Sequence, residues 1–133
     1  MVLDTNIIIR IMTGEGQIGS QARRVLDATA ARYCSVMVQW ELALLISKDR
    51  LKFNMPLADW MERASSYLRF VDVPVTAAIA RDAGSLPGAI HGDPGDRVMI
   101  ATARACVCPL ITTDQKILDY AAQGYVHAID ARL

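Results

Sequence analysis

The sequence predicts an α/β fold: a three-layer α/β/α sandwich around a central, mainly parallel sheet. Short apolar runs alternate along the chain with longer helical patterns, an order typical of parallel strands joined by crossover helices. The composition, 53% hydrophobic and 21% charged, favours a compact folded core over disorder. Because no repeat or linker-like stretch divides the chain, we expect residues 1–133 to form a single domain.

Polar residues that border apolar runs place the elements of the first half. The run at 1–3 is too short for its period to decide, but it ends at Asp4, Thr5 and Asn6, whose small polar side chains suit a helix entry. Ser20 is the expected cap of a second helix. We expect a strand at 1–3, helices over 7–12 and 20–31, a strand at 33–38 and a helix at 39–50.

Proline and glycine mark the elements of the second half. Pro56 stands near the start of a helical pattern, and the residues before Pro74 are biased toward extended backbone. Gly84 and Gly124 follow helical patterns and are expected to end them. We expect helices at 56–68, 76–84, 94–106 and 114–124, and extended segments at 70–75, 108–113 and 125–130.

Charge and terminal composition limit the classes of function. Fourteen basic and fourteen acidic residues cancel, so a nucleic-acid substrate would require a local basic patch and not a global positive field. The N-terminal stretch lacks the basic flank and apolar core of a secretory signal, and no apolar run reaches bilayer-spanning length. We therefore expect a cytoplasmic protein.

Cysteine and histidine offer little for metal binding. The three cysteines, Cys34, Cys106 and Cys108, match no C-x-x-C spacing, and we interpret them as buried apolar thiols. His91 and His127 are the only histidines and each stands alone. A histidine-rich zinc site and a histidine pair for acid and base catalysis are therefore disfavoured.

Four acidic residues fall where a parallel sheet would bring them together. Asp4 and Asp114 each follow an apolar run predicted to be a strand, and open α/β sheets bind ligands beyond the carboxyl ends of their strands. Glu41 shares a helical stripe with Val38, which points it inward. Asp96 lies in the first turn of its predicted helix.

Each acid also has a purely structural interpretation. Asp4 and Asp114 suit helix N-caps. Glu41 could be solvated, because its helix is apolar nearly all round, and Asp96 suits the helix dipole. Asp93, which precedes a proline at the first helical position, is expected to be an N-cap.

The functional interpretation of these acids becomes stronger when they are considered as a group. Two carboxylates about 4 Å apart repel by roughly 4 kcal/mol at an effective dielectric near 20, so a cluster of three or four requires protonation or a cation. Oxygen ligands without histidine or cysteine favour Mg²⁺ or Mn²⁺. Such an ion can hold a phosphate oxygen and activate water for in-line displacement, which indicates phosphodiester hydrolysis.

Four motifs then resemble a known family. "VLDTN", a glutamate in a helix about 35 residues later, "HGDPGDRVMIATA" and "LITTD" occur in the order and at the spacing of the PIN-domain family, specifically the VapC-type toxins of bacterial toxin-antitoxin systems. The resemblance covers essentially the whole chain. It implies a small α/β/α nuclease that cuts RNA with Mg²⁺ or Mn²⁺, often dimeric and held inactive by a cognate antitoxin.

The resemblance also implies roles for individual residues. By position, Asp4, Glu41 and Asp96 match the family's catalytic, metal-binding acids, and Asp114 matches its usual fourth acid. Two further matches are supporting: Thr112, a hydroxyl residue two before that acid, with a water-orienting or indirect role, and Asn6, a small polar residue near the first aspartate.

The "HGDPGDR" stretch matches a "DPxDR" variant found in one branch of these toxins. Asp93, Pro94 and Arg97 fit that variant, in which Asp93 supports the site and does not bind metal. Gly95 departs from the bulky aromatic residue expected at its position, a difference that we assign to local packing.

The RNA and protein partners would use other residues. Two tryptophans, Trp40 and Trp60, could stack on bases but lie in helical patterns that favour the core or an interface. Apolar helices near 38–46 and 57–68 exceed the needs of a small core, which predicts a homodimer and an antitoxin groove among them. Basic candidates for contacting the RNA backbone are Arg10, Lys48, Arg50, Arg97 and Lys116.

Three rival functions remain open at this point. Phosphohydrolases with an aspartyl nucleophile need a second aspartate two residues after the first, where this chain has Asn6. A catalytically silent module that binds RNA or protein is opposed by intact acids at all four positions. A DNA-directed nuclease could use the same metal site, and only the family resemblance favours RNA.

Overall fold

The computed structural model describes residues 1–133 and contains one five-stranded sheet, in which every strand is parallel to its neighbours. Its strands are β1 (Val2–Leu3), β2 (Arg32–Ser35), β3 (Phe70–Val73), β4 (Leu110–Thr112) and β5 (Ala128–Asp130). They lie in the order β3-β2-β1-β4-β5. The first strand along the chain is therefore central, and its carboxyl end lies beside those of β2 and β4.

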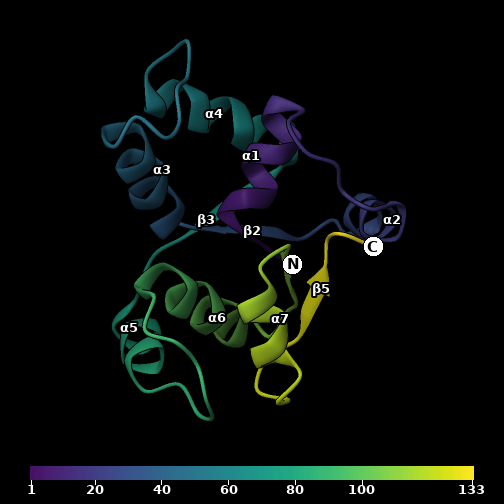
Figure 1. Cartoon of the computed structure of the whole chain (residues 1–133), viewed down its shortest axis with the longest axis vertical. Coiled ribbons are helices and arrows are strands. Elements are labelled where there is room, and N and C mark those ends of the chain that lie inside the picture. The colour runs from purple at the N-terminus through teal and green to yellow at the C-terminus, as the bar shows by residue number, and fades with distance from the viewer.

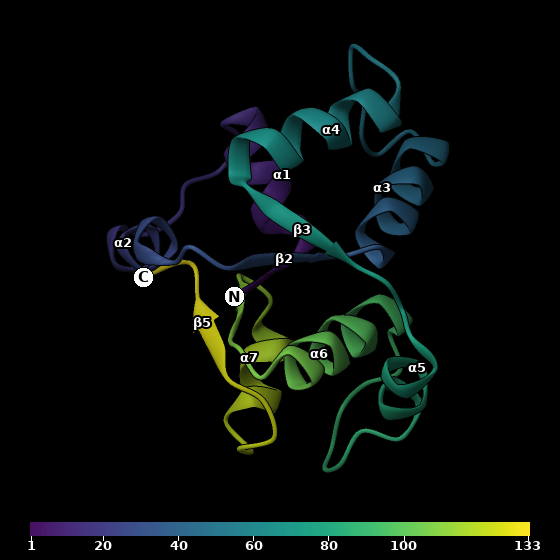
Figure 2. The same cartoon turned by 180° about the vertical axis from the view of Figure 1, so that it is seen from behind.

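Helices cover both faces of the sheet and confirm the predicted α/β/α sandwich. They are α1 (Thr5–Thr13), α2 (Ser20–Ala28), α3 (Met37–Ser47), α4 (Leu57–Leu68), α5 (Ala77–Gly84), α6 (Pro94–Cys106) and α7 (Gln115–Ala121). Helices α1, α3 and α4 lie on one side of the sheet and α5, α6 and α7 on the other (Figures 1 and 2). None of these helices has the length and apolar character required to span a membrane.

The core forms where the central strands meet the helices. Val2 and Leu3 of β1 and Leu110 and Ile111 of β4 are completely buried, and helix α6 buries Ile100 against the same sheet. Each such aliphatic side chain contributes roughly 1.5–3 kcal/mol by leaving water. Because β1 is only two residues long, the residue after it is already at the carboxyl edge of the sheet.

Two predicted boundaries were wrong for identifiable reasons. Strand β2 ends at Ser35 and not at 38, because the Ser35 hydroxyl accepts a hydrogen bond from the Met37 N–H and starts α3. Ser20 is the first residue of α2 and not its cap. Gly19 is the N-cap, and its N–H is bound to the Ala131 carbonyl, so the C-terminal segment sets where that helix begins.

The burial of the tryptophans and cysteines also differs in part from what the sequence patterns predict. Trp60 is a core residue, whereas Trp40 is 51% exposed on α3. Cys34 is buried as expected, but Cys106 and Cys108 are only partly buried, because they flank the end of α6, where the chain leaves the core. The prediction of three buried thiols was therefore correct for one of them.

Candidate metal centre at the carboxyl edge of the sheet

Asp4 is the most buried acid of the site, with 4% of its surface exposed. It follows β1 and caps α1, because one carboxylate oxygen accepts the Thr5 N–H at 2.7 Å. The other oxygen accepts the Thr112 hydroxyl at 2.5 Å. Asp4 is thus a helix cap, as its structural interpretation required, and also a buried charge fixed at the centre of the sheet edge.

Thr112 links two of the predicted acids. It is the last residue of β4 and is fully buried. Its hydroxyl donates to Asp4 and accepts the Asp114 N–H at 2.9 Å. Asp114 in turn caps α7 by accepting the Lys116 N–H at 2.8 Å. The ends of β1 and β4 are therefore joined through one hydroxyl group, and each carries a carboxylate.

Glu41 reaches the same region from α3. Its Oε1 atom is buried and has no hydrogen-bond partner. The atom lies against Gly95 in the first turn of α6, where a Cβ atom would collide with it. The small residue at position 95 therefore affects the site directly, because it leaves the space that the Glu41 carboxylate fills. The sequence-based assignment of Gly95 to local packing alone is therefore wrong.

Asp96 enters from the first turn of α6. Asp93 caps that helix by accepting the Asp96 N–H at 3.0 Å, and Pro94 is the first helical residue, as predicted. Pro94 suits that position because its missing N–H would have had no helical partner. The two aspartates are thus divided between capping the helix and facing the other acids.

One neighbour of Asp96 was missed by sequence reasoning. The Nε2 atom of His91 lies 3.3 Å from a carboxylate oxygen of Asp96. The sequence pattern gives His91 no role, because it has no second histidine nearby. The sequence did contain one indication of this contact, because His91 lies in the same short stretch as Asp93 and Asp96. Thr5 was also missed: its buried hydroxyl has no hydrogen-bond partner, although it lies near enough to Glu41 to lower that group's pKa.

The acids influence one another's protonation. The pKa of Asp96 is raised to about 7, chiefly by burial and in addition by the charges of Asp93, Asp114, Asp4 and Glu41. Burial likewise raises the pKa of Glu41 to about 7, with contributions from Asp4 and Asp93. Burial also raises the pKa of Asp4, although its hydrogen bonds oppose this. The structure therefore brings the predicted acids into one electrostatic cluster.

This cluster fits a hard divalent cation in the kind of atoms it offers. Every acid supplies oxygen, the ligand atom preferred by Mg²⁺ and Mn²⁺, and the buried, unpartnered Oε1 of Glu41 lacks the hydrogen bond that such an atom normally has. No three His, Cys, Asp or Glu side chains, however, converge closely enough to hold a metal ion. Binding would therefore require some of these side chains to move inward.

The other predicted residues differ in their contacts. The Asn6 Oδ1 atom is buried without a hydrogen-bond partner. The guanidinium group of Arg97 donates hydrogen bonds to the carbonyls of Ala83 and His91 and so stabilises the fold. Arg10 makes one long contact of 3.5 Å with the Gln17 carbonyl. Lys116 is exposed at the start of α7, next to Asp114.

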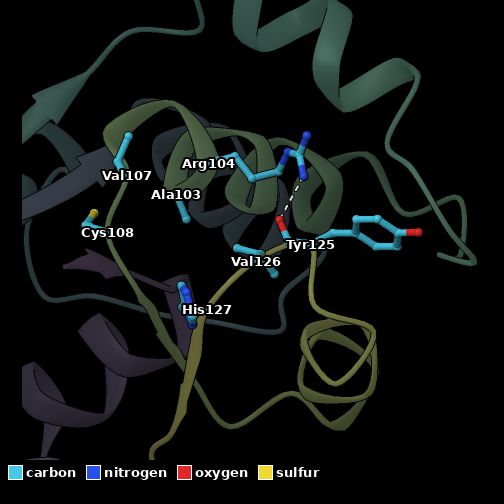
Figure 3. Close-up of a pocket in the computed structure, with 7 residues that line it drawn as sticks. All are labelled: Ala103, Arg104, Val107, Cys108, Tyr125, Val126 and His127. Atoms are coloured by element: carbon cyan, nitrogen blue, oxygen red, sulfur yellow. Dashed lines mark hydrogen bonds between the residues drawn. The ribbon is translucent and has the colours of Figure 1, made fainter.

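The apolar recess in Figure 3 lies elsewhere. Its walls come from the last turn of α6 and from the segments that precede β4 and β5, and Arg104 crosses it to the Tyr125 carbonyl. These segments form the amino edge of the sheet, opposite the acids. The recess contains no carboxylate, so the candidate site is the acidic cluster and not this hollow. The lining residues are Ala103, Arg104, Val107, Cys108, Tyr125, Val126 and His127.

The fold and the site together define a class of protein: a parallel α/β/α sandwich with acidic residues at the carboxyl edge of its sheet. The chain belongs to the PIN domain family, whose match covers residues 1–123. This confirms the resemblance drawn from the four sequence motifs. The chain is also similar to Ribonuclease VapC22 of Mycobacterium tuberculosis (strain ATCC 25618 / H37Rv), with 32% identity over 81 residues. The matched segment makes up 60% of this chain and 61% of that protein.

Solved structures share the fold over nearly the whole chain. VapBC2 from Rickettsia felis, bound to a DNA fragment from its promoter, has a TM-score of 0.69 at 19% identity, covering 96% of each chain. FitAcB from Neisseria gonorrhoeae has a TM-score of 0.64 at 20% identity, covering 96% of this chain and 95% of that one. A toxin-antitoxin complex from Klebsiella pneumoniae scores 0.63 at 19% identity, covering 96% and 94%.

Replacing Asp96 with asparagine should stabilise the metal-free protein at pH 8. The native state holds the Asp96 proton up to about pH 7, whereas an ordinary aspartate releases it near 3.8. The free energy of unfolding of the native protein therefore falls as the pH rises between these values. The variant does not lose this stability, because asparagine does not titrate. We expect Asp96→Asn to gain about 2 kcal/mol at pH 8 and nothing below pH 4, measured by urea denaturation in EDTA.

The matched control for this measurement is Glu62→Gln, which neutralises an exposed carboxylate on α4 outside the cluster. It should change the free energy of unfolding by less than about 0.5 kcal/mol at either pH. An Asp96→Asn variant that is less stable than the native protein at pH 8 would contradict the electrostatic account of the cluster.

Replacing Thr112 with valine should destabilise the fold by about 1–3 kcal/mol. The change keeps the shape of the side chain but leaves Asp4 and the Asp114 N–H without their shared hydroxyl partner. Thr112→Ser, which keeps the hydroxyl and loses only a methyl group, is the control and should retain more stability. Thermal unfolding of both variants compares the two effects, and a valine variant as stable as the serine variant would rule out the bridge.

Proposed function

We propose that this chain is the toxin of a toxin-antitoxin pair, an endoribonuclease that hydrolyses RNA phosphodiester bonds with Mg²⁺ or Mn²⁺. One observation carries the proposal: Asp4, Glu41, Asp96 and Asp114 come from four separate elements to the carboxyl edge of the sheet, where burial and the neighbouring acidic charges raise the pKa of Asp4, Glu41 and Asp96. Gathering these charges costs folding free energy, and a cation would offset that cost. The name of VapC22 as a ribonuclease supports RNA as the substrate.

The chain's own residues would divide the work. Asp4, Glu41 and Asp96 would hold the cation, with Asp114 directly or through water, and the bound ion would activate water and neutralise charge on the phosphate. Thr112 holds the Asp4 carboxylate in place through its hydroxyl. Asp93 supports the site by starting α6, which carries Asp96 to the cluster. Asn6 presents a buried oxygen without a partner at the start of α1.

Backbone contacts to RNA would come from basic residues that the fold leaves available. Lys116 is exposed beside Asp114, and Arg10 makes only a long contact within the chain. Arg97 contributes less in this arrangement, because two of its donors already hold backbone carbonyls. Charge near the cluster attracts the phosphate backbone without selecting a sequence.

Cleavage assays with purified protein test the proposed activity. The protein should cut structured RNA in Mn²⁺ or Mg²⁺ and lose that activity in EDTA. Asp4→Asn should lower the cleavage rate by more than about 100-fold, because it removes the most buried carboxylate of the cluster. Glu62→Gln, outside the cluster, should cleave like the native protein.

Other outcomes of the same assay separate the rival functions. Cleavage that persists in EDTA, or in the Asp4→Asn variant, would contradict a metal-dependent nuclease. Cleavage of DNA in preference to RNA would establish a DNA-directed enzyme. Binding of RNA with no cleavage in either metal would indicate a catalytically silent module.

We also propose that α3 pairs two copies of the chain. Val36, the N-cap residue of α3, and Trp40 and Leu44 on the helix follow one another at four-residue spacing, so they line one side of it. They are 37%, 51% and 36% exposed respectively. A continuous exposed apolar stripe of this kind favours an interface over solvent. The stripe falls on one of the two apolar helical segments from which the homodimer was predicted.

An antitoxin would use a different part of the same layer. A recess between the end of α3 and the start of α4 is lined by apolar side chains, among them Leu51, Phe53 and Met55. We propose that it receives an apolar segment of a cognate antitoxin, which would hold the enzyme inactive. The toxin-antitoxin complex from Klebsiella pneumoniae, which shares the fold, supports a partner of this kind.

Replacing Trp40 with glutamate should weaken self-association by at least tenfold, because a charge would enter the centre of the apolar stripe. Sedimentation equilibrium measures the dimer dissociation constant directly. Tyr67→Glu is the matched control, since Tyr67 is an exposed aromatic residue on α4, outside the stripe. A native protein that remains monomeric at high concentration, or equal effects of both substitutions, would contradict the proposed interface.

A further inference from the structure

One hydrogen bond to the His91 ring indicates which of its nitrogens carries the proton. The Asp93 N–H donates to the Nδ1 atom of His91 at 3.2 Å. A backbone N–H can only donate, so Nδ1 must be the unprotonated, accepting nitrogen. In a neutral imidazole the single proton then resides on Nε2. That nitrogen is therefore a hydrogen-bond donor and not a free lone pair.

The donor faces the carboxylate of Asp96. Nε2 lies 3.3 Å from Asp96 Oδ2, and the two side chains are 26% and 20% exposed. The atoms are within contact distance, but their geometry falls short of a hydrogen bond, and the buried Nε2 atom has no other partner. A small rotation of either side chain would complete the bond, and nothing else in the fold competes for this donor.

The backbone around His91 is held from both sides. Arg97 donates from Nη1 to the His91 carbonyl at 3.2 Å and from Nε to the Ala83 carbonyl at 2.7 Å. Asp93 is fixed by its bond to the Asp96 N–H. The residues from His91 to Arg97 are thus linked to one another by hydrogen bonds, which fix the imidazole relative to the first turn of α6.

We propose that His91 is a positioning residue for Asp96, whose carboxylate it orients by donating from Nε2 to Oδ2. The inference rests on the proposed function, because orientation matters only if that carboxylate binds a cation. One oxygen of Asp96 is then occupied by the imidazole, and the other is left for the cation. Groups that hold a metal-binding carboxylate in this way tune metal affinity by roughly 10-fold to 100-fold.

The protonation pattern is tested first, in the metal-free native protein. A long-range proton-nitrogen NMR spectrum distinguishes the two neutral forms of an imidazole. We expect His91 in the form protonated at Nε2. A spectrum that shows protonation at Nδ1 would overturn the proposal whatever the protein's activity.

Two substitutions then separate the roles of the two nitrogens. His91→Gln places an amide donor near the position of Nε2, whereas His91→Asn places an accepting oxygen near the position of Nδ1 and offers no donor to Asp96. We expect the glutamine variant to keep the Mn²⁺ dissociation constant within about threefold. The asparagine variant should weaken Mn²⁺ binding by about 10-fold to 100-fold, measured by electron paramagnetic resonance titration.

A role in loop structure alone gives the opposite order, because the bond to the Asp93 N–H would survive in the asparagine variant only. Thermal unfolding checks that both variants fold. Asparagine binding Mn²⁺ as well as the native protein, or folded glutamine and asparagine variants weakened equally, would overturn the proposal. Native protein that binds Mn²⁺ but cuts no RNA would refute the proposed nuclease and leave the orientation of Asp96 intact.

Discussion

The buried carboxylate of Asp4 is the constraint on which the rest of the site depends. It lies at the end of the central strand, where the Thr5 N–H and the Thr112 hydroxyl bind its two oxygens. These bonds fix the start of α1 and join the ends of β1 and β4. A charge in this position is expensive to bury unless its oxygens are hydrogen-bonded, so the surrounding strand ends and helix starts are arranged to satisfy it.

The remaining acids add electrostatic repulsion to this arrangement. Glu41 and Asp96 approach from opposite faces of the sheet, on α3 and α6, and both are pushed toward the protonated form. Gly95 makes the approach of Glu41 feasible, because it has no side chain where the carboxylate lies. Such opposition between folding and charge placement is typical of functional sites.

Local sequence signals predicted most of the fold. The alternation of apolar runs and helical patterns was sufficient for the sandwich, and the Asp93-Pro94 pair marked the start of α6 correctly. The errors arose where distant segments decide a boundary. Gly19 is the N-cap residue of α2 because the C-terminal segment binds its N–H, and a contact across more than one hundred residues leaves no trace in the pattern around Ser20.

The sequence by itself determined which residue types could carry the chemistry and which of them would start helices, since capping depends on neighbours three residues away or fewer. It did not determine how the acids face one another. Only the tertiary structure placed Glu41 of α3 against Gly95 of α6. The physical reason is that side-chain direction at the sheet edge follows from how helices pack on opposite faces, which no local pattern records.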